Sequence, residues 1–199
     1  SGDFYNFSDL GNNKFGFGVA DVSGKGIKSS LLMSKASSLY RCLSKTIFSA
    51  STLIKILNDE ICETTTRGMF VTMIVGVYDK NKNELLLANA GHEPPLIFSK
   101  DGNFKTIDEA GPPLGIAPNF KFAEQIISFK ESSMYIFTDG ITEMKNNNGE
   151  MLGQEGFQDY IKKYQTTPNN KRLQKMIEDL ISSGRIQKDD LTIVTVDGN

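Results

Sequence analysis

The sequence has few of the side chains that bind soft metals or form disulfide bridges. Its 199 residues contain one histidine, His92, and two cysteines, Cys42 and Cys62. The cysteines do not have the spacing of a zinc motif, so a zinc site is disfavoured. Both cysteines lie in segments with apolar periodicity, which favours reduced core thiols and a cytoplasmic location.

The sequence also lacks an excess of positive charge and any long hydrophobic run. The net charge is −2, so no basic surface for nucleic acid is indicated. The longest apolar run, residues 69–78, has the length of a strand, far below the roughly 20 residues that cross a bilayer. We therefore expect no nucleic-acid partner and no membrane contact by this domain.

The composition that remains is that of an ordinary globular protein. Hydrophobic residues make up 39% of the chain and charged residues 23%, which is typical of folded domains. A chain of 199 residues suits one large domain. We therefore expect a single domain over residues 1–199.

Two kinds of hydrophobic periodicity divide the chain into strands and helices. Strands are expected at residues 2–7, 15–21, 69–78, 84–90, 96–99, 104–107, 121–128, 133–138 and 190–196. Helices are expected at residues 27–45, 52–64, 153–164 and 170–182. Short turns between consecutive strands favour antiparallel pairing. The simplest layered arrangement is an α+β fold, a four-layer α-β-β-α sandwich of two mainly antiparallel sheets flanked by helices.

The first two helices each carry an apolar stripe that should face a sheet. In the first helix the stripe consists of Ile27, Leu31, Ala36, Leu39, Tyr40 and Leu43. In the second helix it consists of Leu53, Leu57 and Ile61, widened by Ile54 and Ile56. Asn58, Asp59 and Glu63 are expected on the side of the second helix that faces water.

The chain is organised around residues 15–27, where an apolar strand ends at an acidic residue, Asp21, before a Gly-Lys-Gly turn and a helix. A carboxylate at the end of a buried strand is held rigidly, and Gly24 and Gly26 let the backbone pass close to a ligand. A nucleotide phosphate loop is rejected because five residues separate Gly18 from Gly24, and a glycine follows Lys25.

Four aspartates occupy strand ends or a hairpin, each beside a glycine or a second acid. They are Asp3, Asp21, Asp139 and Asp189. If the strand ends converge at one rim, these carboxylates repel one another unless a cation neutralises them. Ligation by oxygen alone suits Mg²⁺ or Mn²⁺. The alternative is that each is an ordinary turn residue, since Asp-Gly pairs are common in turns.

Seven short motifs occur in a characteristic order along the whole chain. They are Gly2-Asp-Phe-Tyr, Asp21-Val-Ser-Gly-Lys-Gly, Met69-Phe-Val-Thr-Met, Asn89-Ala-Gly-His, Gly111-Pro-Pro-Leu-Gly-Ile, Phe137-Thr-Asp-Gly-Ile-Thr-Glu and Asp189-Asp-Leu-Thr-Ile. In this set the chain resembles the metal-dependent protein serine/threonine phosphatases (PPM), in their bacterial stage II sporulation E and RsbU-like branch. The resemblance implies the sandwich fold, two Mn²⁺ or Mg²⁺ ions and hydrolysis of phosphoserine or phosphothreonine, typically on an anti-anti-sigma factor.

The resemblance also implies roles for individual residues. Asp21 would bridge the two ions and the carbonyl of Val22 would be a further ligand. Asp139 and Asp189 would hold the first ion, and Asp3 would support the second. Asp21, Asp139 and Asp189 are thus the expected catalytic set. A hydroxide held between the ions would attack the phosphorus in line, without a covalent enzyme intermediate.

Three further residues, Asn6, Lys25 and His92, bear on the predicted site. Asn6 stands where the family often has a second acid, and Lys25 stands where many relatives have histidine. Lys25 could help only electrostatically. His92 lies in the Asn-Ala-Gly-His turn, where it is either structural, simply exposed, or a residue that positions substrate.

Two classes of function stay open at this stage. The leading interpretation is a phosphoprotein phosphatase, and the alternative is a non-catalytic, partner-binding regulatory module of the same fold. All four aspartates are present, which favours catalysis. We expect the chain to be the C-terminal output domain of a longer signalling protein, behind a sensor or receiver domain, and a homodimer is left open.

Overall fold

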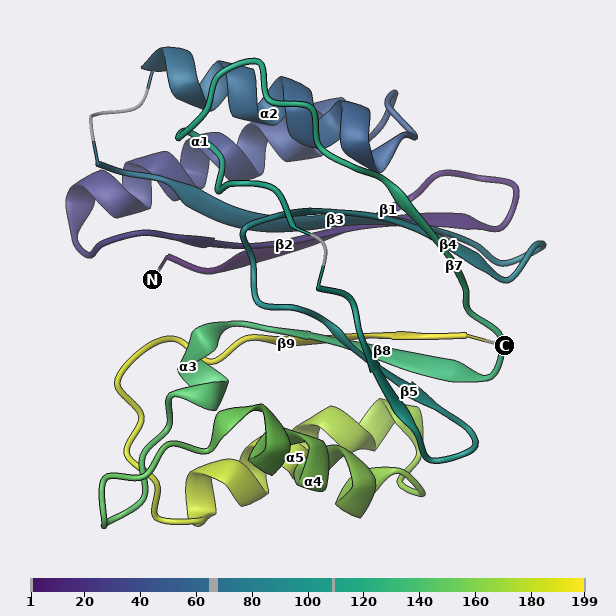
Figure 1. The fold of residues 1–199 in the computed structure, drawn as a ribbon, viewed down its shortest axis with the longest axis vertical. Helices are drawn as coiled ribbons and strands as arrows, with labels where there is room; N and C mark the ends of the chain where they lie inside the picture. Colours follow the sequence, from purple (N-terminus) through teal and green to yellow (C-terminus); the bar gives the residue numbers. More distant parts are fainter. Residues whose placement is uncertain (1, 65–67, 109, 199) are drawn as a thin grey trace. The chain divides into compact units, whose positions relative to one another are not determined.

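The structure is a computed structural model that describes residues 2–64, 68–108 and 110–198 (Figure 1). The chain forms two compact units. The first comprises residues 1–136 together with residues 194–199, and the second comprises residues 137–193. Within the described residues, no helix has both the length and the apolar character needed to span a membrane.

The first unit contains a five-stranded sheet with the order β1-β2-β3-β4-β7. Its strands are β1 (Phe4–Asp9), β2 (Lys14–Val22), β3 (Val71–Asp79), β4 (Glu84–Ala90) and β7 (Gln125–Ser128). All neighbouring strands pair antiparallel, and short turns join β1 to β2 and β3 to β4. β3 is central and almost entirely buried, so its continuous apolar run covers both faces of the sheet.

A second sheet has the order β6-β5-β8-β9. Its strands are β5 (Leu96–Ser99), β6 (Phe104–Thr106), β8 (Ser132–Phe137) and β9 (Ile193–Asp197). Side chains from both sheets form one buried cluster, in which Phe17, Val19 and Ile74 of the first sheet join Ile97 and Met134 of the second. The two sheets are therefore stacked face to face through an apolar core.

Two helices cover the other face of the first sheet (Figure 1). They are α1 (Ile27–Leu43) and α2 (Ala50–Thr64), and both pack on strands of that sheet. The stripe predicted for α1 is wrong at its start, because Ile27 is 81% exposed and Leu31 is 67% exposed. The buried row is Leu32, Ala36 and Tyr40. Leu31 precedes this row by one residue, which turns its side chain about 100° away.

The second unit contains three helices, α3 (Asp139–Thr142), α4 (Gly153–Tyr164) and α5 (Asn169–Ser182). α4 buries Phe157 and Ile161, and α5 buries Met176 and Leu180. The two helices contact one another, and Lys163 Nζ lies 2.5 Å from Asp179 Oδ2 across them. α3 was not predicted, since four residues are too few to establish a helical period.

The remaining differences from the sequence prediction are local. The strand predicted at 121–128 begins only at Gln125, because Phe122 is buried in the helix-side core instead of pairing in the ladder. The strand predicted at 190–196 begins only at Ile193, and the residues before it belong to the second unit. Cys42 is exposed and Cys62 is half-buried, so the prediction of two core thiols is wrong. The α+β class with two antiparallel sheets is confirmed.

Candidate functional site

Asp21 is the penultimate residue of β2, between β1 and β3. It pairs with Thr72, and Val22 pairs with Val71. After the strand, the Ser23 amide donates to the Phe70 carbonyl at 3.0 Å, and the Phe70 amide donates to Ser23 Oγ at 2.8 Å. The start of the turn is therefore tied to the residues that precede β3.

The turn after β2 depends on two glycines. Gly24 has a φ of 85° and Gly26 a φ of 89°, in the left-handed region that favours glycine. The chain can therefore reverse from the strand and begin α1 at Ile27. Ser29 Oγ in the first turn of α1 donates to the Val22 carbonyl at 3.5 Å, so α1 is tied to the predicted metal-binding carbonyl.

Asp3 lies beside Asp21 because β1 pairs with β2. Phe4, the first residue of β1, is opposite Ala20, so Asp3, the residue before it, leads toward Asp21. A Cβ placed on Gly2 would lie 2.8 Å from the Val22 carbonyl oxygen and 3.0 Å from Asp21 Oδ1. Only glycine lets the chain run this close, and the first unit thus gathers three of the predicted ligands, namely Asp3, Asp21 and Val22.

The buried side chain of His92 contributes to the same region through Thr72. Thr72 Oγ1 donates to the main-chain oxygen of Asp21 at 3.4 Å and is 3.0 Å from His92 Nδ1. The turn that holds His92 is closed by Asn89, whose side chain accepts from the His92 amide at 2.8 Å and donates to its carbonyl at 3.0 Å. His92 is only 4% exposed, so the exposed alternative is wrong.

In the second unit, the segments that carry Asp139 and Asp189 lie side by side. The Thr138 amide donates to the Thr192 carbonyl at 3.2 Å, and the Thr192 amide donates to Thr138 Oγ1 at 3.2 Å. A Cβ on Gly140 would lie 2.0 Å from the Asp190 carbonyl oxygen, so this approach also requires glycine. Asp139 and Asp189 are both exposed.

Each unit thus presents part of an oxygen-rich set of donors. In the part of the chain that the structure describes, neither unit by itself brings three Asp, Glu, His or Cys side chains together. The donors are carboxylates and a main-chain carbonyl, and this chemistry fits a hard divalent cation such as Mg²⁺ or Mn²⁺. The residues present therefore fit the metals that the sequence predicts.

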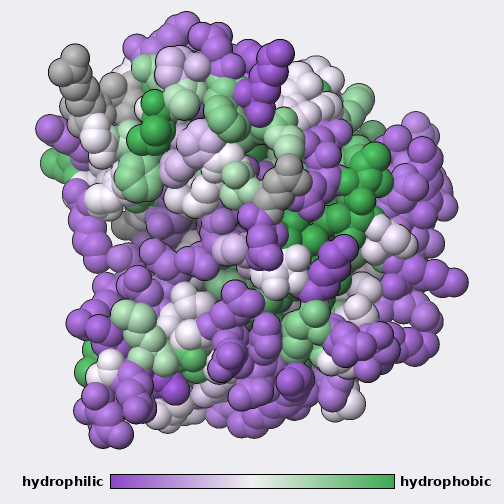
Figure 2. Space-filling model, viewed as in Figure 1, coloured by the Kyte–Doolittle hydropathy of each residue, from purple (hydrophilic) through white to green (hydrophobic). Residues whose placement is uncertain are grey.

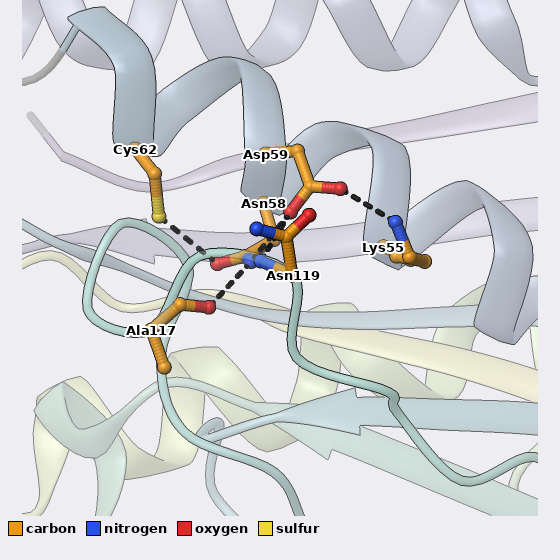
Figure 3. A network of polar contacts seen from close by, with 6 residues as sticks. All are labelled: Lys55, Asn58, Asp59, Cys62, Ala117 and Asn119. Carbon is orange, nitrogen blue, oxygen red and sulfur yellow. Dashed lines mark hydrogen bonds and ion pairs between the residues drawn. The ribbon is translucent and has the colours of Figure 1, made fainter.

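A second polar cluster joins α2 to residues 111–119, and the sequence did not reveal it (Figure 3). Asn58 is fully buried, so its prediction as a residue facing water is wrong. Its amide nitrogen donates to the Ala117 carbonyl at 2.8 Å, and its amide oxygen accepts from the Gly115 amide at 3.1 Å. The next residue, Asp59, accepts from the Asn119 amide at 2.8 Å.

Two ionisable groups of this cluster respond to their surroundings. A hydrogen bond from Lys55, at 2.7 Å, is the main cause that lowers the pKa of Asp59 below its usual range. Burial raises the pKa of Cys62, whose sulfur lies 3.6 Å from Asn58 Oδ1. An asparagine that hydrogen-bonds the main chain of a loop distant in sequence has no signature in the local sequence. Only the tertiary structure reveals such a residue.

Residues 111–119 also contact β3, the strand that pairs with β2 next to Asp21. The Leu114 amide donates to the Val71 carbonyl at 2.8 Å, and the Val71 amide donates back at 3.0 Å. The Gly111 amide donates to the Asn89 carbonyl at 2.8 Å, next to the turn of His92. Through these bonds, α2 is connected to the beginning of β3.

Comparison with known proteins is consistent with this arrangement. Phosphoserine phosphatase RsbU of Bacillus subtilis is 29% identical over 199 residues, which cover 98% of this chain and 59% of that protein. The SiaA-PP2C domain of Pseudomonas aeruginosa superposes with a TM-score of 0.86 at 16% identity, covering 100% of this chain and 81% of that one. A structure of the PP2C phosphatase domain of SpoIIE from Bacillus subtilis, with a fragment of its regulatory domain, superposes with a TM-score of 0.81 at 20% identity. The match covers 98% of this chain and 58% of that one.

These structural likenesses show the fold, and they confirm the predicted α+β sandwich with two antiparallel sheets and flanking helices. The chain spans about three-fifths of RsbU, the curated relative described above. The family model for stage II sporulation protein E matches residues 11–198. The chain therefore belongs to the stage II sporulation protein E (SpoIIE) family.

Proposed function

We propose that the chain is a divalent-metal-dependent phosphoprotein phosphatase that hydrolyses phosphoserine or phosphothreonine. The observation that carries the proposal is the arrangement of acids within each unit. Gly2, the neighbour of Asp3, lies against Asp21 and the Val22 carbonyl, and the residues next to Asp139 lie beside the segment of Asp189. Membership of the SpoIIE family and the similarity to phosphoserine phosphatase RsbU support this activity.

In this proposal Asp21 would contribute to holding both of two Mn²⁺ or Mg²⁺ ions, with the Val22 carbonyl as a further ligand. Asp139 and Asp189 would hold the first ion, and Asp3 would support the second. When bound, the ions supply an activated water and neutralise charge on the phosphate. Asp21, Asp139 and Asp189 are the catalytic set, and their role is to hold and orient these ions.

The surrounding residues keep the carboxylates in place. Thr72 and His92 fix the main chain at Asp21, and Gly2 and Gly140 allow close approach of the segments that carry the acids. Lys25 is exposed on the turn after β2, where its charge favours approach of an anionic phosphate. Asn6 adds no charge at the position where relatives often have an acid. We therefore expect that a high metal concentration is needed to fill the second metal site.

The phosphorylated partner and the control of activity belong to the same proposal. The substrate is a phosphoprotein of the anti-anti-sigma type. A sensor or receiver domain of the whole protein would act on α1 and α2, because α1 begins directly after the Asp21 turn and Ser29 contacts the Val22 carbonyl. A shift of α1 would then move a metal ligand, so that one of two states assembles the second metal site. A cytoplasmic location and a homodimer stay predictions.

The alternative is a partner-binding module without catalysis. The phosphatase and the binding module are distinguished by measuring phosphate release from a phosphoserine protein and from p-nitrophenyl phosphate. Each substrate is tested with millimolar Mn²⁺ and with a chelator. We expect slow, metal-dependent release from both substrates. Absence of release at saturating Mn²⁺, with retained binding of the phosphoprotein, would favour the binding module.

A further inference from the structure

A small antiparallel sheet in the second unit places three side chains in a row. Lys145 is bridged to Met151 on one side and to Ile186 on the other. The Ile186 amide donates to the Lys145 carbonyl at 2.8 Å, and the Leu152 amide donates to the Met144 carbonyl at 2.8 Å. Residues directly opposite each other in antiparallel strands project from the same face. Met151, Lys145 and Ile186 therefore form one ridge with a cation at its centre.

The two faces of this small sheet differ in burial. On the ridge, Met151 and Ile186 are each 54% exposed. The neighbours Met144 and Leu152, which alternate to the other face, are buried. The sheet is thus anchored from behind, and the core does not require the apolar side chains in front. Single exposed apolar residues are ordinary, but adjacent ones around a lysine make a patch that suits a partner.

The ridge is built from the same chain segments that carry two predicted metal ligands. Lys145 follows Asp139 by six residues, and Ile186 precedes Asp189 by three residues. The ridge is therefore next in sequence to two acids of the proposed centre. We propose that the ridge docks the protein part of the phosphoprotein substrate, through an anionic segment that presents an apolar side chain near its phosphorylated residue. This inference rests on the proposed function.

Charge complementarity supports this occupant. A phosphoserine residue carries a charge of about −1.5 to −2 at neutral pH. Lys145 lies in the centre of the ridge, and Lys188 is exposed two positions beyond Ile186. A second copy of this chain fits less well, because a two-fold contact centred on the ridge would bring Lys145 against its own copy. Apolar side chains around the cation would exclude water from the contact.

The test compares two substrates and one matched control. The double variant Met151→Ser/Ile186→Ser removes the apolar side chains of the ridge. Ile181→Ser is the control, because Ile181 is 58% exposed in the same unit but lies on α5. The substrates are a serine-phosphorylated anti-anti-sigma protein and p-nitrophenyl phosphate, at saturating Mn²⁺. For the double variant we expect kcat/KM on the phosphoprotein to fall about tenfold or more, with unchanged kinetics on p-nitrophenyl phosphate.

Several outcomes would overturn docking at the ridge. They are unchanged phosphoprotein kinetics in the double variant, an equal loss on both substrates, or an equal loss in Ile181→Ser. Loss of a concentration-dependent dimer in the double variant, seen by sedimentation, would assign the ridge to self-association instead.

A binding measurement separates this inference from the proposed function. Calorimetric titration of the phosphoprotein into metal-free protein should give an affinity that is about tenfold weaker for the double variant. If the parent protein hydrolyses neither substrate, the phosphatase proposal fails, while this titration still decides whether the ridge binds the phosphoprotein. Lys145→Glu should also weaken binding, and Lys145→Arg should retain it.

Discussion

Thr72 and His92 are joined by a hydrogen bond of 3.0 Å between Thr72 Oγ1 and His92 Nδ1. The same hydroxyl contacts the main-chain oxygen of Asp21 at 3.4 Å. A buried imidazole from the turn after β4 is thus connected, through one side chain of β3, to the strand that carries the predicted bridging ligand. From this relationship we predict that the buried His92 positions the main chain at Asp21.

Removing this connection should lower stability and weaken metal binding. Thr72→Val keeps the shape of the side chain but loses the hydroxyl, and we expect a loss of about 1 kcal/mol in the free energy of unfolding. His92→Ala also leaves a cavity, and we expect a loss of about 2–4 kcal/mol. Urea denaturation measures both values. Activity titrated against Mn²⁺ should show a higher half-saturating concentration for Thr72→Val, and an unchanged value would contradict the positioning role.

Local patterns were sufficient to predict most strands and the acidic turns. The hairpin of β1 and β2 and the buried run of β3 follow from period and turn residues within a few positions. The predicted acids Asp3 and Asp21 come close because this hairpin is antiparallel. Their proximity was therefore predictable before any tertiary information.

Features that depend on distant partners were not predictable in this way. Asn58 has helical neighbours that suggest an exposed position, yet its partners Gly115 and Ala117 belong to a separate loop. The bond of Thr72 to His92 likewise requires the alignment of β3 and β4. The start of the apolar stripe on α1 was also missed, because Leu31 and Leu32 are equally apolar and only packing selects one.

Asp21→Asn should abolish phosphatase activity while the fold survives. The carboxamide has nearly the same shape but lacks the negative charge that would hold the two cations of the proposed centre. Asp3→Asn should reduce activity less, since Asp3 is proposed to support only one ion. Asp159→Asn, an exposed acid on α4, is the matched control and should keep full activity. Circular dichroism checks the fold, and parent-like turnover of Asp21→Asn would exclude the proposed bridging role.

Asp59 should make the protein more stable at neutral pH than in acid. The hydrogen bond from Lys55 lowers the pKa of Asp59 in the folded state. A carboxyl with a depressed folded pKa contributes stability above its unfolded pKa of about 3.9, and this contribution is lost as the pH falls toward the folded pKa. We expect Asp59→Asn to be less stable at pH 7 and to lose less stability than the parent between pH 5 and pH 3. Urea denaturation at these pH values compares the slopes, and parallel slopes would contradict this assignment.

Asn58→Ala should release residues 111–119 from α2. The substitution leaves the part-buried Gly115 amide and Ala117 carbonyl without the Asn58 side chain, and a buried polar group that loses its partner costs about 1–3 kcal/mol. We expect the free energy of unfolding to fall by about 2–4 kcal/mol. Lys55→Ala is the control from the same cluster, because it removes only a partly exposed ion pair worth about 0–1 kcal/mol.

The same substitution should also affect the proposed metal site. The loop that Asn58 holds is bonded through Leu114 to Val71, which pairs with Val22 next to Asp21. Loss of the connection should therefore raise the Mn²⁺ concentration that gives half-maximal hydrolysis of p-nitrophenyl phosphate, whereas Lys55→Ala should leave it unchanged. If Asn58→Ala lowers stability but keeps the parental metal requirement, the cluster stabilises α2 without influencing the Asp21 turn. If stability also stays within about 0.5 kcal/mol of the parent, the buried amide does not hold the loop.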